Sequence, residues 1–137
     1  YADVVRGSID DFETLYRKTD PAAIYKAEVS FYCKRFICTQ GAESTVVQAD
    51  GGFSREYPTA SGEVVSTIGA GDNFNAGFVF ALLRDGITRA DIMAGLAPAQ
   101  WDALVTTAQQ FAAESCKSIY NYVSPAFGKQ MSAYLNK

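Results

Sequence analysis

The stretch STIGAGDNFNAGF, residues 66–78, decides the fold around it. Val64 and Val65 predict the end of a strand just before it, and the apolar residues after Asp72 predict a helix. Two glycines permit a tight turn and let backbone N–H groups approach a ligand closely. A helix start adds N–H donors without partners and the positive end of the helix dipole. The pattern therefore predicts a site for an anion, most naturally a phosphate.

Asp72 lies in the first turn of the predicted helix, and the residues alone support two interpretations of it. An aspartate at a helix start is most often a cap that accepts hydrogen bonds from backbone N–H groups. The same carboxylate could instead take a proton from a nucleophile that approaches a bound anion. At this point both interpretations stay open.

The stretch resembles the signature near the C-terminus of the ribokinase-type (PfkB family) carbohydrate kinases, which reads roughly Asp-Thr-Thr-Gly-Ala-Gly-Asp-x-Phe-x-Ala-Gly. The matching positions are Thr67, Gly69, Ala70, Gly71, Asp72, Phe74, Ala76 and Gly77. The resemblance implies an α/β, ribokinase-like (Rossmann-like) three-layer sandwich. It also implies ATP-dependent transfer of a phosphoryl group to a sugar hydroxyl. Within the family, the sequences of residues 5–8 and 66–77 are most similar to those of fructokinase-type members.

The resemblance also implies roles for single residues. Asp72 resembles the catalytic base that accepts the proton of the attacking sugar hydroxyl. The backbone of Gly69, Ala70 and Gly71 resembles the anion hole that holds the ATP phosphates. Nucleotide-binding positions follow by the same resemblance at Thr39, Gly41 and Thr67. The family's glycine three residues after Gly41 is replaced here by Ser44, so this segment departs from the pattern.

Ser8 and Asp11 stand where the family often has Asn-x-x-Glu, a segment linked to Mg²⁺ and phosphate. The resemblance therefore implies Mg²⁺ beside ATP, with Ser8 and Asp11 as metal-linked residues that act through water. Their spacing is equally that of a capping box at a helix start. Ser66 stands where many members have an aspartate linked to a monovalent cation, so activation by such a cation stays in doubt.

Composition excludes several classes of function. The chain has 137 residues, a size typical of one domain, with a net charge of −3 and no basic cluster, which argues against a nucleic-acid partner. No apolar run approaches the roughly 18 residues that a membrane span needs, and no targeting segment is visible. The chain has no histidine, which excludes His-based catalytic triads, and three cysteines without a Cys-x-x-Cys motif. Free thiols in a reducing cytoplasm are expected.

The rest of the chain alternates predicted strands and helices, an order that favours an α/β fold with a partly parallel sheet. Strands are predicted at residues 2–7, 36–39, 44–49, 53–57 and 64–65, with a hairpin turn at 50–52. Helices are predicted from Ser8, from Pro21 to Lys34, from Asp72 to a stop at Gly86, from Thr88, from Pro98 and from Ser124-Pro125. We expect Trp101 to lie in the core and residues 120–122 to pack as a helix end.

The resemblance covers the whole chain but only the later half of the family's usual length. The interpretation is therefore residues 1–137 as the single nucleotide-binding and catalytic part of a sugar kinase, with the N-terminal sugar-binding and lid part absent. Two alternatives are a non-catalytic nucleotide- or anion-binding module and an interaction fragment. The second alternative follows from a strand edge that would lie unpaired around Val4 and Val5 and could join copies of the chain.

Overall fold

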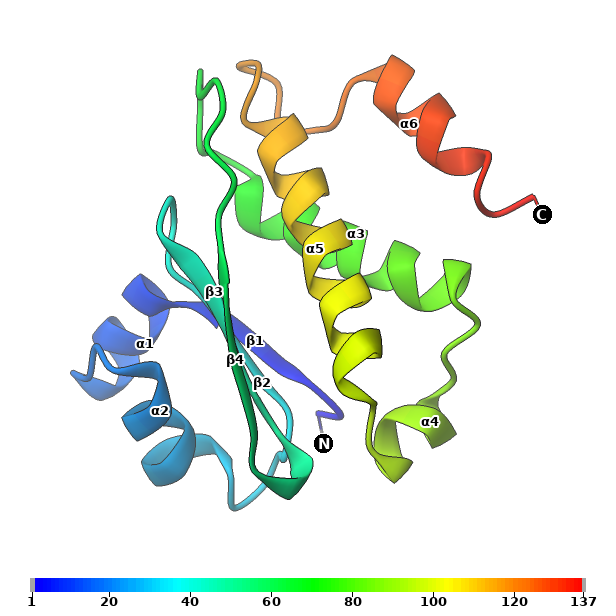
Figure 1. Cartoon of the computed structure of the whole chain (residues 1–137). Helices are drawn as coiled ribbons and strands as arrows, with labels where there is room; N and C mark the ends of the chain where they lie inside the picture. Colours follow the sequence, from blue (N-terminus) through cyan, green and yellow to red (C-terminus); the bar gives the residue numbers. More distant parts are fainter. Residues whose placement is uncertain (1, 137) are drawn as a thin grey trace. The chain divides into compact units, whose positions relative to one another are not determined.

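Four short strands form the only sheet within residues 2–136, the part of the chain that the computed structural model describes (Figure 1). Their order is β1 (Val5–Ser8), β2 (Phe36–Thr39), β3 (Ser44–Ala49) and β4 (Phe53–Pro58). β1 runs parallel to β2, whereas the β2–β3 and β3–β4 pairs are antiparallel. The sheet is therefore mixed, as predicted, and β1 forms one of its edges. The first strand begins three residues later than predicted.

The sheet belongs to the first of two compact units into which the chain divides. This unit comprises the residues up to Thr59 together with Arg89–Leu96, which contain the short helix α4 (Arg89–Ala94). The second unit comprises Ala60–Thr88 and the residues from Ala97 onward.

The hairpin between β3 and β4 forms as the sequence predicts. Asp50–Gly52 makes a 3₁₀ turn, in which Gly51 and Gly52 have φ angles of 71° and 78°. Such positive φ angles are open to glycine at little cost, and this explains the glycine pair at the turn. The turn fixes the register in which Ala49 faces Phe53 and Ser44 faces Pro58.

Two helices pack their apolar side chains against one face of the sheet. α1 (Ile9–Tyr16) brings Phe12 onto Gly7, where a Cβ atom would lie 2.7 Å from the phenyl ring. α2 (Pro21–Ile24) begins at the Asp20 cap and the predicted proline. The buried residues of this cluster are Phe12, Ile24, Val29, Cys33, Phe36 and Cys38. Figure 1 shows both helices on the same side of the strands.

The prediction of one helix from Pro21 to Lys34 is wrong in its second half. After Ile24 the chain widens into a π-helical turn, Tyr25–Val29, and the helix ends there. Because hydrogen bonds in a π-turn span five residues, Val29 lies on the buried face together with Ile24. Phe31, which lies within the predicted helix, is 75% exposed.

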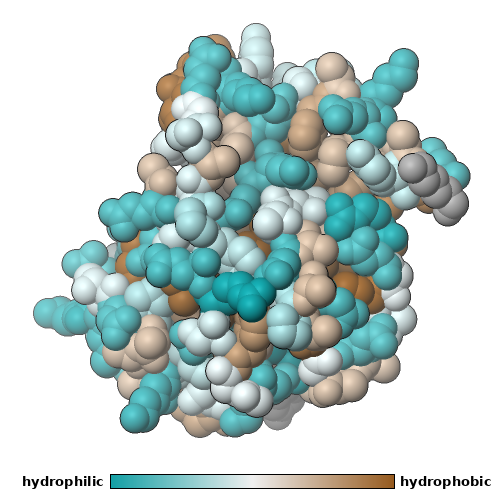
Figure 2. Space-filling view, viewed as in Figure 1, coloured by the Kyte–Doolittle hydropathy of each residue, from teal (hydrophilic) through white to brown (hydrophobic). Residues whose placement is uncertain are grey.

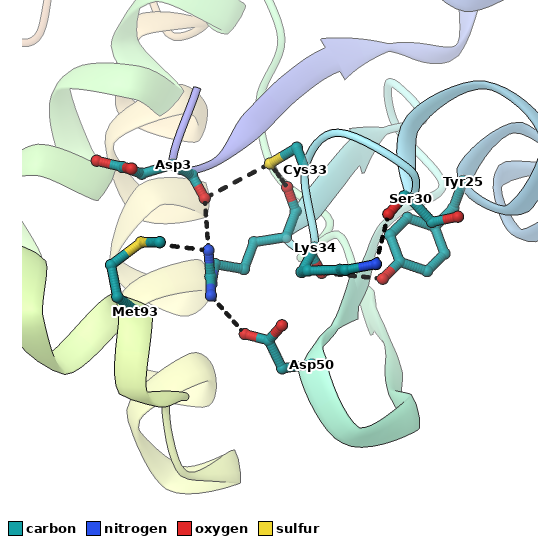
Figure 3. A network of polar contacts seen from close by, with 8 residues as sticks. Asp3, Tyr25, Ser30, Cys33, Lys34, Asp50 and Met93 are labelled. Atoms are coloured by element: carbon teal, nitrogen blue, oxygen red, sulfur yellow. Dashed lines mark hydrogen bonds and ion pairs between the residues drawn. The ribbon is translucent and has the colours of Figure 1, made fainter. Parts of the chain in front are cut away.

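A buried arginine ties four separate segments of the first unit together (Figure 3). Arg35 precedes β2 and forms an ion pair with Asp50 of the hairpin turn at 2.8 Å. Its guanidinium also donates to the backbone oxygen of Asp3 and contacts the sulfur of Met93 in α4. Arg89 of α4 forms a second ion pair with Asp3, at 2.7 Å. These contacts hold α4 within the first unit although it follows the sheet by some thirty residues of chain.

Helices make up the second unit. α3 (Ala70–Arg84) packs against α5 (Pro98–Ser115), and α6 (Pro125–Ser132) follows with Ser124 as its cap. The two helices approach closely at Gly77, where a Cβ atom would lie 2.8 Å from the Ala108 Cα atom. Trp101 of α5 is 1% exposed, so its predicted place in the core is confirmed.

Two predictions fail in the loops of the second unit. Val64 and Val65 form no strand; they are 61% and 50% exposed, and the Val65 N–H donates to the carbonyl of Cys116 instead of to a neighbouring strand. Tyr120 and Tyr122 are not a packed helix end: they are exposed and stack on each other, with ring centroids 5.6 Å apart. Figure 2 shows hydrophobic residues gathered at the upper left, where the loop before α3 lies in Figure 1.

Candidate functional site

The start of α3 offers backbone N–H groups that no helical carbonyl satisfies. The helix cap is Gly69, whose φ of 83° requires glycine and which supplies no capping side chain. The first α-helical bond runs from Asn73 N to Gly69 O at 3.0 Å, and Ala70 N donates to Thr67 O at 3.2 Å. The amides of Gly71 and Asp72 precede the first helical bond, so they remain available to an anion at the positive end of the helix.

Asp72 is exposed at the third helical position, next to these amides. The capping interpretation of this residue is not supported, because α3 has no side-chain hydrogen bond at its cap. Its carboxylate is exposed in the first turn of α3, beside the amides that precede the first helical bond.

Two asparagines that the sequence analysis did not single out lie directly at this turn. The buried Asn73 side chain donates from its Nδ2 atom to the carbonyls of Gly69 (2.9 Å) and Asn121 (3.0 Å). Asn121 also lies against Gly69, where a Cβ atom would be 3.0 Å from the Asn121 Cβ. A polar side chain inside a helix that otherwise favours apolar residues was the one available signal for Asn73. No sequence signal marks Asn121.

Ser8 and Asp11 form a complete capping box at the start of α1. The Ser8 hydroxyl accepts from Asp11 N at 3.1 Å, and the Asp11 carboxylate accepts from Ser8 N at 3.0 Å. These bonds to Ser8 lower the pKa of Asp11 below its usual value, with a smaller contribution from the charge of Arg6. The cap is thus confirmed, and the carboxylate stays ionised at neutral pH.

Thr39 and Gly41 lie at and just after the end of β2. The Thr39 hydroxyl accepts from the Arg6 guanidinium at 3.0 Å, and Gly41 takes a φ of 57° in the following turn. Ser8 ends β1 and pairs in register with Thr39, so both polar residues lie at the carboxyl ends of two parallel strands. Ligands of open α/β sheets bind beyond this edge.

The predicted site residues thus fall into two groups. Thr67, Gly69, Ala70, Gly71 and Asp72 lie together in the second unit, and Ser8, Asp11, Thr39 and Gly41 lie in the first. Within the described range 2–136, no group of three or more His, Cys, Asp or Glu side chains could hold a metal ion. Burial raises the pKa of the Cys38 thiol to about 12, so this cysteine is no nucleophile at neutral pH. The described residues include no helix able to cross a membrane.

Solved structures with the same fold include a riboside kinase and a fructokinase. Aminoimidazole riboside kinase from Salmonella enterica, in complex with aminoimidazole riboside and an ATP analogue, matches 99% of this chain with a TM-score of 0.72 and 20% identity. A fructokinase from Vibrio cholerae, bound to fructose, ADP and potassium, matches 98% with a TM-score of 0.74 and 20% identity. The chain spans 43% and 41% of these two structures. The fold is therefore the α/β ribokinase-like fold.

The family follows from the sequence comparison. Residues 1–126 match the model of the pfkB family of carbohydrate kinases, and the chain belongs to this family. An ATP-dependent 6-phosphofructokinase from Thermoanaerobacterium thermosaccharolyticum is 30% identical over 95 residues, which are 69% of this chain and 29% of that protein. The chain thus spans less than a third of this curated relative and about two fifths of the solved structures.

Proposed function

We propose that this chain is the nucleotide-binding and catalytic part of an ATP-dependent sugar kinase. The observation that carries the proposal is the start of α3, where the amides of Gly71 and Asp72 precede the first helical bond and the Asp72 carboxylate lies exposed beside them. Membership of the pfkB family supports the reaction class, a phosphoryl transfer to an alcohol group of a carbohydrate.

In this proposal the amides around Gly69, Ala70, Gly71 and Asp72 hold charge on the phosphoryl group during transfer. Asp72 accepts the proton of the sugar hydroxyl, and a base in this position contributes about 10²- to 10⁴-fold in rate. Thr67, Thr39 and Gly41 contact the nucleotide. A sugar-binding and lid part outside these 137 residues completes the site.

The residues present also fit Mg²⁺, the ion that ATP carries. Mg²⁺ keeps several waters and is bound by one or two carboxylates together with substrate phosphates, so a large cluster of acidic side chains is not needed. Asp11 offers such a carboxylate, because only one of its oxygens serves the cap. We assign Asp11 and Ser8 to the hydration shell of the ion. Activation by a monovalent cation has no comparable support, since Ser66 supplies no carboxylate.

The test is Asp72→Asn and Asp72→Ala in the full-length protein, assayed by coupled ADP release with Mg-ATP. We expect kcat to fall by about 100-fold or more, while ATP binding measured by calorimetry persists. Asp10→Asn, which changes an exposed aspartate in the first turn of α1, is the matched control and should leave turnover unchanged. Variants of Asp72 that turn over normally would exclude it as the base.

The sugar is best sought among fructose derivatives. One fructokinase is among the similar structures, and the curated relative is a 6-phosphofructokinase. A panel of fructose, fructose 6-phosphate, ribose and adenosine in the same assay would identify the acceptor.

The three free cysteines, two of them buried, suit a cytoplasmic enzyme.

A non-catalytic nucleotide-binding module is the second candidate. It is favoured by the family positions that differ here, namely Ser8, Asp11, Ser44 and Ser66. The same assays separate the two: a module would bind ATP but release no ADP with any sugar, and Asp72→Asn would then change nothing. A third candidate role is association of copies of the chain through the β1 edge.

A further inference from the structure

The side chain of Asn73 makes two contacts that join separate parts of the second unit. Asn73 follows Asp72 directly and lies in the first turns of α3, with only 9% of its surface exposed. Asparagine is unfavourable inside a helix, and a buried amide is costly unless it is hydrogen-bonded. Both costs are offset here, because Nδ2 donates to the carbonyls of Gly69 and Asn121 at 2.9 and 3.0 Å.

The first contact fixes the peptide that opens the anion site. The Gly69 carbonyl accepts from both the backbone N–H and the side chain of Asn73, so it is held towards the helix. A peptide unit is planar and trans, so the N–H of Ala70 is directed to the opposite side, away from the helix body. Holding this carbonyl therefore also holds the Ala70 N–H in its bond to the Thr67 carbonyl, and the amides of Gly71 and Asp72 follow as the open donors of the turn.

The second contact anchors the loop between α5 and α6. Asn121 lies in that loop, between the exposed Tyr120 and Tyr122. The beginning of the same loop is tied at Cys116, whose carbonyl accepts from Val65 N and Ser66 N, just before the turn. The loop is thus bonded at Cys116 to the residues before the glycine turn and at Asn121 to the first turns of α3.

We propose that Asn73 is a positioning residue that sets the glycine turn of the anion site and anchors the 116–123 loop beside it. The proposal rests on the proposed function for its kinetic consequence, but its structural consequence is independent of activity. Asn73 acts through the turn and the loop and does not itself touch the reacting atoms.

The experiment compares three variants of the full-length protein by hydrogen–deuterium exchange and by kinetics. Asn73→Leu is nearly isosteric and removes both donated bonds. Asn73→Ser keeps a hydroxyl that can bond to the carbonyl four residues earlier, that of Gly69, but is too short to reach Asn121. Asn75→Leu is the matched control, because Asn75 is an exposed asparagine two positions further along α3.

We expect Asn73→Leu to speed exchange in both 66–72 and 116–123. We expect it to lower kcat about 10- to 100-fold, the scale of the loss when an outer-shell partner is removed at metal sites. We expect Asn73→Ser to speed exchange in 116–123 alone and to recover most of kcat. Asn75→Leu should change neither quantity.

Exchange that is unchanged in both segments, or equal in Asn73→Leu and Asn75→Leu, would overturn the proposal whatever the activity. Faster exchange with no loss of kcat would confine Asn73 to a structural role and overturn the positioning claim. If Asn73→Leu does not fold, the segment-specific exchange of Asn73→Ser decides. A full-length wild-type protein that binds no ATP would refute the proposed function, whereas the exchange measurements would still test the contacts.

Discussion

A single glycine, Gly77, lets the two long helices of the second unit approach closely. Gly77 has no room for a methyl group, since a Cβ atom would lie 2.8 Å from the Ala108 backbone and from the Phe111 side chain. Gly128 in α6 has nothing within 4 Å of the same position. Gly77 is thus tightly packed, whereas the space beside Gly128 is open.

We predict opposite effects of alanine at these two positions. Gly77→Ala should destabilise the protein by about 1–3 kcal/mol, because the overpacking outweighs the gain in helix propensity. Gly128→Ala should stabilise it by about 0.5–1 kcal/mol through propensity alone. Urea unfolding of both variants checks the pair. A Gly77→Ala variant as stable as Gly128→Ala would show that α3 and α5 do not pack as closely as described.

Helix starts and strand ends account for most of what could be predicted from sequence. The caps at Ser8 and Ser124, the prolines that open α2, α5 and α6, and the hairpin glycines all act through neighbouring residues. The failures depend on contacts distant in sequence. The sequence predicts a strand at Val64 and Val65, but these residues form none. The Val65 N–H donates to the carbonyl of Cys116 instead. The π-turn at Tyr25–Val29 has no local signature.

The candidate site divides in the same way. The turn at 69–72 could be predicted because glycine spacing and helix dipole are properties of a short stretch. Asn73 and Arg6 could not be assigned, because their partners Asn121 and Thr39 lie far along the chain. Only the three-dimensional structure shows that these side chains have hydrogen-bond partners.

The cap of α1 predicts a pH dependence at the scale of one element. Because bonds from Ser8 lower the pKa of Asp11, its ionised form stabilises the fold above the ordinary aspartate value, and this contribution is lost as the pH falls from about 4 through the lower folded pKa. Ser8→Ala should cost about 1 kcal/mol at pH 7, and Asp11→Asn should reduce the loss of stability that occurs as the pH falls below about 4. Thermal unfolding across this range, with Asp10→Asn as control, checks both. An unchanged pH profile in Asp11→Asn would contradict the role of the cap.

At the scale of the whole molecule, the edge of the sheet predicts self-association of the 137-residue chain. β1 is an edge strand, and its outer backbone groups can pair with a second chain. We expect sedimentation velocity to show oligomers that grow with concentration. Val4→Lys, which places a charge just before β1, should weaken association while circular dichroism stays unchanged. A monomer at high concentration would rule out the edge as an interface.

The first unit consists of two separate segments of the chain, so a single cut between them would divide this unit between two peptides. A cut in the loop after β4 would give a first peptide with the whole sheet and a second peptide that carries α4. The Asp3–Arg89 ion pair and the contact of Arg35 with Met93 would then join two molecules instead of two parts of one. Arg89–Ala94 of the second peptide would thus be held to the first by side-chain contacts.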